Sequence, residues 1–319
     1  MSHPEGTPAL AAHLDLIEFF RESGDEWARW MMDSYRPEAQ TDYRALLYGV
    51  KDLATAETVF VSKEMCAIIE KAARELPDVP LQEENLMWRR AFILFERPIV
   101  HERNFVEADG EGVATTSAIY FTHESKTITL AEEFVEGKLS GEKKSGVIHV
   151  TMTDSAQIDI LREVFGISTS LIPFDYSAWA YGKKWKTTQD SGEWGKSVYE
   201  GLAQQRKLLL AVNLIAAQYI ASVRQSRGPR QQRRRAERMG LVPEYGDITY
   251  VTLRRIRQRQ GDGDGKSAGY SHRFIVRGFW RHQWYPSRGE HHLKWIDPYI
   301  KGDESLPLVI KDRVHKLVR

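Results

Sequence analysis

Residues 270–302 read YSHRFIVRGFWRHQWYPSRGEHHLKWIDPYIKG, a segment in which aromatic and basic residues alternate. Because successive side chains of a β-strand point to opposite faces, this alternation predicts a strand with two unlike faces. One face would carry Arg273, Ile275, Arg277, Phe279 and Arg281, and the other Phe274, Val276, Gly278, Trp280 and His282. The second face can be buried, whereas the first is suited to contact a polyanion.

The formal net charge of +1 conceals an unequal distribution of charge along the chain. Residues 221–319 hold 22 Lys and Arg against 10 Asp and Glu, whereas residues 1–220 hold 23 against 34. A local basic field attracts phosphates whatever the overall charge, so we expect the C-terminal part to contact RNA or a ribonucleoprotein. The alternative is that the two parts neutralise each other within the fold.

Composition predicts a folded protein of the cytoplasm that does not enter a membrane. Of 319 residues, 42% are hydrophobic and 28% charged, which is ordinary for globular proteins. The lone cysteine, Cys66, excludes an intramolecular disulfide and suits a reducing compartment. No signal peptide is recognisable after Met1, and the longest apolar stretch, 208–217, is interrupted by Asn213 and too short to span a bilayer.

Hydrophobic periodicity changes along the chain from helical to β-type and back. The first ninety residues are predicted to be helical. Helices are expected over 9–21 and 25–35, and a third helix is expected to begin after its N-cap Ser62 and to end at Pro77. Strands are then predicted over 90–100, 118–123, 127–131, 147–153 and 168–176, a helix over 155–165, and one long apolar helix over 192–227.

These elements predict an α+β fold. It would comprise a helical N-terminal region with a mixed sheet, a long buried helix and a small basic C-terminal β module. The expected division is a helical and sheet region that recognises a target over 1–225, a basic linker over 226–245, and the β module over 246–319. The linker contains most of the run RQSRGPRQQRRRAER, which holds seven arginines.

Arginines and one aromatic ring are the residues predicted to bind RNA. Arginine binds phosphate through two parallel hydrogen bonds and stacks on bases, and an exposed ring stacks on unpaired bases. Trp280 and Trp284 are expected to hold the β module together instead. The predicted RNA-binding residues are Arg233, Arg234, Arg235, Arg273, Arg277, Arg281 and Phe279.

Two further classes of function remain open from the residues. A metal-independent, toxin-like ribonuclease would use His282 and His292 as acid and base, with Arg277 stabilising the phosphorane. A pure protein-interaction module would instead pair its arginines with the acidic half of the chain. No metal or cofactor is expected, because the histidines lack a neighbouring cysteine and nucleotide-binding motifs are absent.

The C-terminal segment resembles a known family, the type V-A anti-CRISPR-like proteins and their relatives on phages and plasmids. The resemblance lies in a pattern H-x4-RG-x-W followed by K-W-x-x-P. Its residues here are His272, Arg277, Gly278, Trp280, His282, Trp284, Lys294, Trp295 and Pro298. Phe279 stands where these relatives carry a histidine.

The resemblance implies a regulatory protein of a phage or mobile element rather than a conventional enzyme. The C-terminal module would meet RNA or the translating ribosome, and the acidic N-terminal half would select a protein or nascent-peptide target. The outcome would be reduced production of a host or competitor protein. The sequence does not indicate an oligomeric state.

Overall fold

The computed structural model separates the chain into two compact units, residues 1–254 and residues 255–319, and each is described by itself. The described residues are 7–35, 47, 50, 52–77, 79–107, 110–124, 146–154, 171–180, 192–218, 220–242, 246–254, 273–276, 278–296, 299–302 and 306–307. The predicted strand over 127–131 and helix over 155–165, together with His272, Arg277 and Pro298, lie outside these residues.

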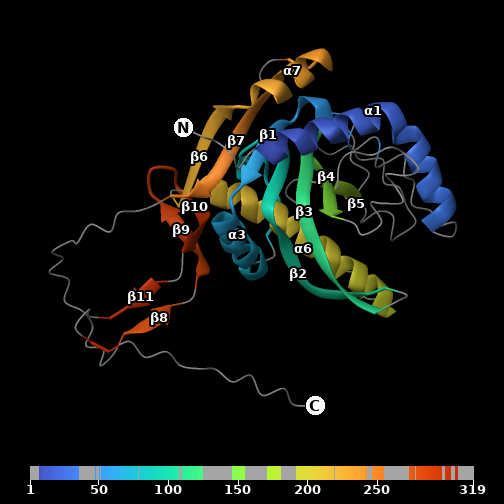
Figure 1. Cartoon of the computed structure of the whole chain (residues 1–319). Coiled ribbons are helices and arrows are strands. Elements are labelled where there is room, and N and C mark those ends of the chain that lie inside the picture. The colour runs from blue at the N-terminus through green and yellow to red at the C-terminus, as the bar shows by residue number, and fades with distance from the viewer. Residues whose placement is uncertain are drawn as a thin grey trace. The chain divides into compact units, whose positions relative to one another are not determined.

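The first unit is built on a seven-stranded sheet whose strand order is β5-β4-β3-β2-β1-β7-β6 (Figure 1). Strand β1 pairs in parallel with β2 on one side and with β7 on the other, while the remaining pairs are antiparallel. The strands are β1 (Glu57–Val61), β2 (Arg90–Glu107), β3 (Gly110–Glu124), β4 (Gly146–Asp154), β5 (Leu171–Ala180), β6 (Ala221–Arg227) and β7 (Asp247–Leu253). Helices and a mixed sheet in one unit confirm the α+β prediction.

Helices cover both faces of this sheet (Figure 1). Helices α1 (Thr7–Tyr35) and α7 (Arg230–Arg238) share one apolar cluster with the sheet, to which Leu10, Phe92 and Ala236 belong. Helices α3 (Lys63–Glu75) and α6 (Gly192–Ala216) contact each other, and α3 contacts β2 and β7. The described part of the unit also contains two short 3-10 helices, Leu53–Thr55 and Glu83–Asn85.

Strand β1 was not foreseen, because the first ninety residues were predicted to be helical. Its sequence ETVFV is short and buried at every position but the first. A strand buried on both faces shows a continuous apolar run in place of alternation, so its period resembles that of a buried helical segment. The strand is nevertheless interior to the sheet.

The N-terminal helical predictions are confirmed with one change of extent. The two stretches predicted as separate helices form the single helix α1, and α3 begins after Ser62 and ends before Pro77. The Ser62 side chain makes no capping hydrogen bond. Instead Glu96 of β2 accepts the backbone N–H of Lys63 at 2.5 Å, so a carboxylate from the sheet caps the helix.

The long helix predicted over 192–227 ends at Ala216, and that prediction is wrong for its last part. Residues 221–227 form β6, which pairs antiparallel with β7. Within α6, Asn213 is fully buried and bonded at both ends of its amide. Its Nδ2 donates to Leu209 O at 2.8 Å and its Oδ1 accepts the Met87 N–H at 2.9 Å.

The second unit contains two two-stranded sheets, β10-β9 and β11-β8, so a continuous strand through 273–282 is not formed. Its strands are β8 (Phe274–Val276), β9 (Phe279–Tyr285), β10 (Glu290–Ile296) and β11 (Tyr299–Lys301). The break falls at Gly278, where an added Cβ would lie 2.5 Å from the ring of Trp295. Glycine there allows the buried Trp295 to pack against backbone.

The boundary between the units also differs from the expected division. Residues 226–245 were expected to be a linker, but they complete β6 and form α7, which packs on α1. Strand β7 was assigned to the C-terminal module and instead lies in the main sheet beside β1. The compact units therefore divide after Arg254.

Candidate nucleic-acid interface

Helix α7 has one face toward the fold and one toward solvent. Its sequence RQQRRRAER follows Pro229, whose φ of −53° suits the start of a helix. Ala236 is its buried residue and packs in the cluster with α1. Some arginines of α7 therefore attach the helix to its neighbours in the fold, and others face outward.

Two of the three α7 arginines predicted to bind RNA take part in attaching the helix. Arg235 donates from Nη1 to Asp15 at 2.5 Å and from Nη2 to Glu18, both on α1. Arg233 is half-buried, and its Nε donates to the carbonyl of Gly228 at 3.0 Å. These two guanidinium groups therefore stabilise the position of α7 against α1 and the chain segment that precedes α7.

The outward face of α7 carries Arg230, Arg234 and Arg238, which we call the arginine row. All three are exposed, and their spacing of four residues aligns them along one side of the helix. They line one surface hollow together with Gln231 and Glu237. No carboxylate of the described part of the chain forms an ion pair with them.

Only Arg234 of this row was singled out from the sequence. Arg230 and Arg238 lie in the same run, and helical spacing applied to the run RQQRRRAER would have selected them. The prediction missed them because this run was assigned to a linker without periodicity. A helix places residues four positions apart on one face, about 6 Å apart along its axis.

The predicted residues of the second unit have different surroundings. Arg281 is exposed, lies opposite Lys294 in the β9–β10 register and donates to Gln283. Phe279 is 38% exposed and lies on the same face. Arg273 is half-buried and donates from Nε to the carbonyl of Leu306 at 2.8 Å, so it has a structural contact.

The two histidines considered for RNA cleavage lie on opposite faces of the β9–β10 hairpin. His282 is paired with Leu293, and the next residue, Gln283, is paired with His292. Directly opposed residues share a face and successive residues alternate. His292 contacts Glu290 at 2.7 Å on its own face. The pair therefore cannot act as acid and base on one phosphate within this hairpin.

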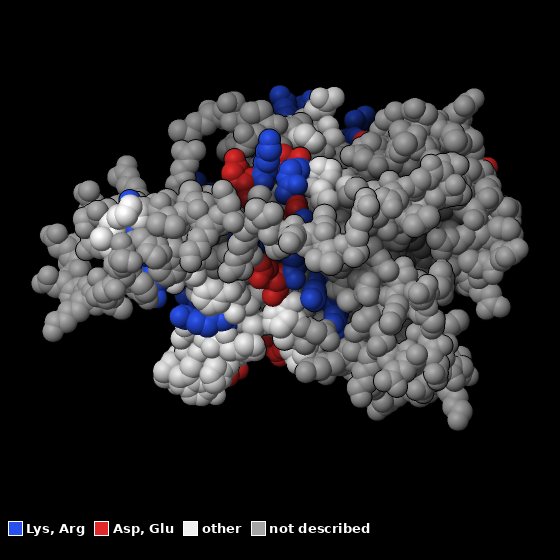
Figure 2. Space-filling model, turned by 90° about the horizontal axis from the view of Figure 1, so that it is seen from below, with Lys and Arg blue, Asp and Glu red and all other residues white. Residues whose placement is uncertain are grey.

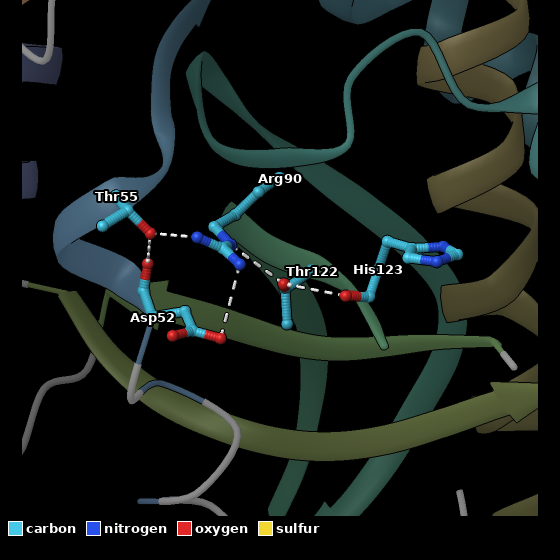
Figure 3. A network of polar contacts seen from close by, with 5 residues as sticks. All are labelled: Asp52, Thr55, Arg90, Thr122 and His123. Carbon is cyan, nitrogen blue, oxygen red and sulfur yellow. Dashed lines mark hydrogen bonds and ion pairs between the residues drawn. The ribbon is translucent and has the colours of Figure 1, made fainter. Parts of the chain in front are cut away.

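The first unit also contains a polar network centred on Arg90 (Figure 3). Arg90 on β2 donates from Nε to Thr122 at 3.0 Å, from one Nη to Thr55, and from the other to Asp52 at 3.5 Å. Every guanidinium nitrogen has a protein acceptor. We interpret the network as a structural link between residues 52–55 and strands β2 and β3.

Two buried titratable groups also have structural surroundings. His13 of α1 stacks on Phe92, with ring centroids 4.7 Å apart, and its nitrogens contact Thr58 Oγ1 at 2.7 Å and Leu53 O at 2.9 Å. Burial lowers the pKa of His13 to about 4, partly offset by the Leu53 hydrogen bond. Burial raises the pKa of the Cys66 thiol to about 11, so it is a poor nucleophile.

Charges on the face drawn in Figure 2 are mixed. Described Lys and Arg side chains lie beside Asp and Glu side chains there, rather than in a field of one sign. Within the described residues, no three His, Cys, Asp or Glu side chains come together as a metal site. Among the helices described, none has the length and apolarity needed to cross a membrane.

Comparison with known proteins gives a structural likeness but no match to a family. No protein-family model matches the chain, and no curated protein matches it. Among solved structures, it is similar to the protein in the "Crystal structure of AcrVA2", with 13% sequence identity and a TM-score of 0.42. The likeness covers 92% of this chain and 93% of that one.

Proposed function

We propose that this protein binds RNA, free or within a translating ribonucleoprotein, and thereby reduces production of a host or competitor protein. The biological setting, an anti-CRISPR-like regulator of a phage or mobile element, follows from the resemblance of the C-terminal segment to that family. A protein or nascent peptide would be the second partner. The part of the proposal that can be tested on the isolated protein is RNA binding.

The arginine row of α7 is the observation that carries the proposal. Arg235 and Arg233 are held by the fold, so the helix presents Arg230, Arg234 and Arg238 from a fixed position. Their guanidinium groups are exposed and make no ion pair with a described carboxylate. A row of unpaired arginines on a fixed helix supplies phosphate contacts without first breaking internal ion pairs.

The test is binding of a fluorescein-labelled, mixed-sequence RNA oligonucleotide to the full chain over a range of salt concentrations. The triple variant Arg230→Ala, Arg234→Ala and Arg238→Ala should bind more weakly, because three phosphate contacts are lost. For single strands each contact contributes about 0.7 to the slope of log affinity against log salt, so the slope should flatten by about 2. Fluorescence anisotropy measures both quantities.

A matched control removes the same charge elsewhere on the surface. Arg29, Lys63 and Arg89 are exposed and lie outside α7. Their triple Ala variant should keep a slope close to that of the wild type. If the two triple variants behave alike, the row is not the binding surface; if the wild type fails to bind RNA, the protein-interaction alternative is favoured.

A further inference from the structure

Trp284 was expected to help hold the C-terminal module together, but the structure leaves its side chain 45% exposed. The packing role belongs to two other tryptophans. Trp295 is 4% exposed, and the ring of Trp280 meets it edge to face at 5.5 Å. Trp284 lies on the same face of the hairpin but further toward the turn, where burial ends. Its indole is therefore available to a partner.

The hairpin holds this indole in a defined position. Trp284 lies directly opposite His291 in the β9–β10 register, and the two rings are 4.8 Å apart at an interplanar angle of 49°. The adjoining turn is closed by the N–H groups of Arg288 and Gly289, which both donate to Tyr285 O at 3.0 Å. Gly289 has a φ of +67°, which glycine adopts without strain. A ring supported in this way loses little freedom when it stacks.

The charges of the hairpin indicate what kind of partner fits. Of its described cations, all exposed, Arg288 lies in the turn that follows Trp284, while Arg281 and Lys294 lie on the opposite face. Its described acid, Glu290, also lies on the opposite face. Glu290 already contacts His292 at 2.7 Å. An exposed ring beside a turn that carries an arginine, on a face with no described carboxylate, matches an unpaired base with a flanking phosphate better than it matches an aliphatic protein surface, which offers no negative charge.

We propose that Trp284 stacks on an unpaired base of single-stranded RNA, with His291 supporting the indole and Arg288 of the adjoining turn holding a flanking phosphate. The proposal rests on the proposed RNA-binding function and adds a base-dependent contact to the phosphate contacts of the arginine row. It is independent of base identity, because every base has a face on which an aromatic ring can stack.

The test compares two probes of equal length, an RNA oligonucleotide and the corresponding abasic oligonucleotide, which keeps the phosphates but lacks the bases. For the full chain, Trp284→Ala should bind the RNA about tenfold more weakly, within the range found for loss of one stacked base. Its affinity for the abasic probe should equal that of the wild type. Trp284→Phe, which keeps a stacking ring, should restore most of the lost affinity.

The outcomes separate this inference from the proposed function. If Trp284→Ala binds RNA as well as the wild type while the arginine-row variant is weakened, stacking is refuted and phosphate binding stands. Equal weakening of both probes by Trp284→Ala would also overturn stacking, since the effect would not depend on bases. If the wild type binds neither probe, both proposals fail. An Ile300→Ala variant, which removes another exposed apolar side chain of this unit, should change neither affinity.

Discussion

His13 shows how one residue makes the stability of the fold depend on pH. It is buried in α1, accepts or donates hydrogen bonds at both ring nitrogens, and has a pKa lowered to about 4 by burial. In the unfolded chain the same group has a pKa near 6.5. Between these two values the unfolded state binds a proton that the folded state excludes, so lowering the pH favours unfolding.

The predicted consequence is a loss of unfolding free energy on the order of 3 kcal/mol as the pH falls from 7 to 4, attributable to His13. Urea denaturation at several pH values measures it in the wild type. In His13→Gln, which cannot take up a proton, the decline over this range should be smaller by that amount. Parallel pH profiles for the two proteins would show that His13 does not titrate as its burial requires.

At the scale of elements, the junction between β6 and α7 depends on a glycine that leaves no room for a side chain. An added Cβ on Gly228 would lie 2.3 Å from the carbonyl oxygen of Gly246 and 2.5 Å from Leu10 Cδ2. The Gly228 N–H also donates to that carbonyl at 2.9 Å. Backbone therefore passes backbone at the point where the chain leaves the sheet for α7.

Gly228→Ala should destabilise the protein by about 1–3 kcal/mol, the usual cost of overpacking a tight contact. Thermal unfolding followed by circular dichroism measures the change. Gln231→Ala, an exposed substitution on α7 itself, serves as the control and should leave the melting temperature almost unchanged. A Gly228→Ala protein as stable as the control would mean that the junction relaxes without cost.

Elements with a clear period were predictable from the sequence, and those defined by tertiary contacts were not. Helix α3 and strand β4 were predicted within a residue or two, because their patterns are regular and turn residues flank them. Strand β1 was missed because burial on both faces removes alternation, and β6 was assigned to the preceding helix. Its sequence ASVRQSR is polar, and pairing with β7 determines its conformation.

The sequence predicts that the candidate site is a basic surface, but it identifies only some of the residues that form this surface. The concentration of arginines in one run is visible in the sequence, and α7 does present a basic surface. Which arginines face solvent depends on Asp15 and Glu18, more than two hundred residues earlier, which hold Arg235. Similarly, the exposure of Trp284 depends on where the hairpin packing ends, which alternation alone does not specify.

At the scale of the whole molecule, the division of charge broadly follows the division into units. Residues 255–319 hold 14 Lys and Arg against 7 Asp and Glu, and residues 1–254 hold 31 against 37. The arginine row of α7 is therefore a basic surface on an acidic unit. Both proposed contacts with RNA, the row in the first unit and the hairpin in the second, are tested separately by the experiments above.

The position of β7 in the main sheet leads to a prediction about the boundary between the two units. Strand β7 pairs in parallel with β1 from Thr58↔Ile248 to Val61↔Val251, and Ile248 and Val251 are fully buried. The Ser62 N–H also donates to Val251 O at 3.0 Å. A fragment that ends at residue 225 lacks β7, so one side of β1 loses its hydrogen-bond partners and β6 loses the strand with which it pairs.

We therefore expect the fragment 1–254 to unfold cooperatively and the fragment 1–225 to lack a cooperative transition, although only 29 residues at one end distinguish them. Thermal denaturation monitored in the far and near ultraviolet would compare the two fragments with the full chain. A further fragment, 1–242, keeps α7 but not β7 and should behave like 1–225. Cooperative unfolding of 1–225 would contradict this expectation, because the sheet would then be stable without β7. The boundary between the units would in that case lie near residue 225, as the composition of the sequence predicts.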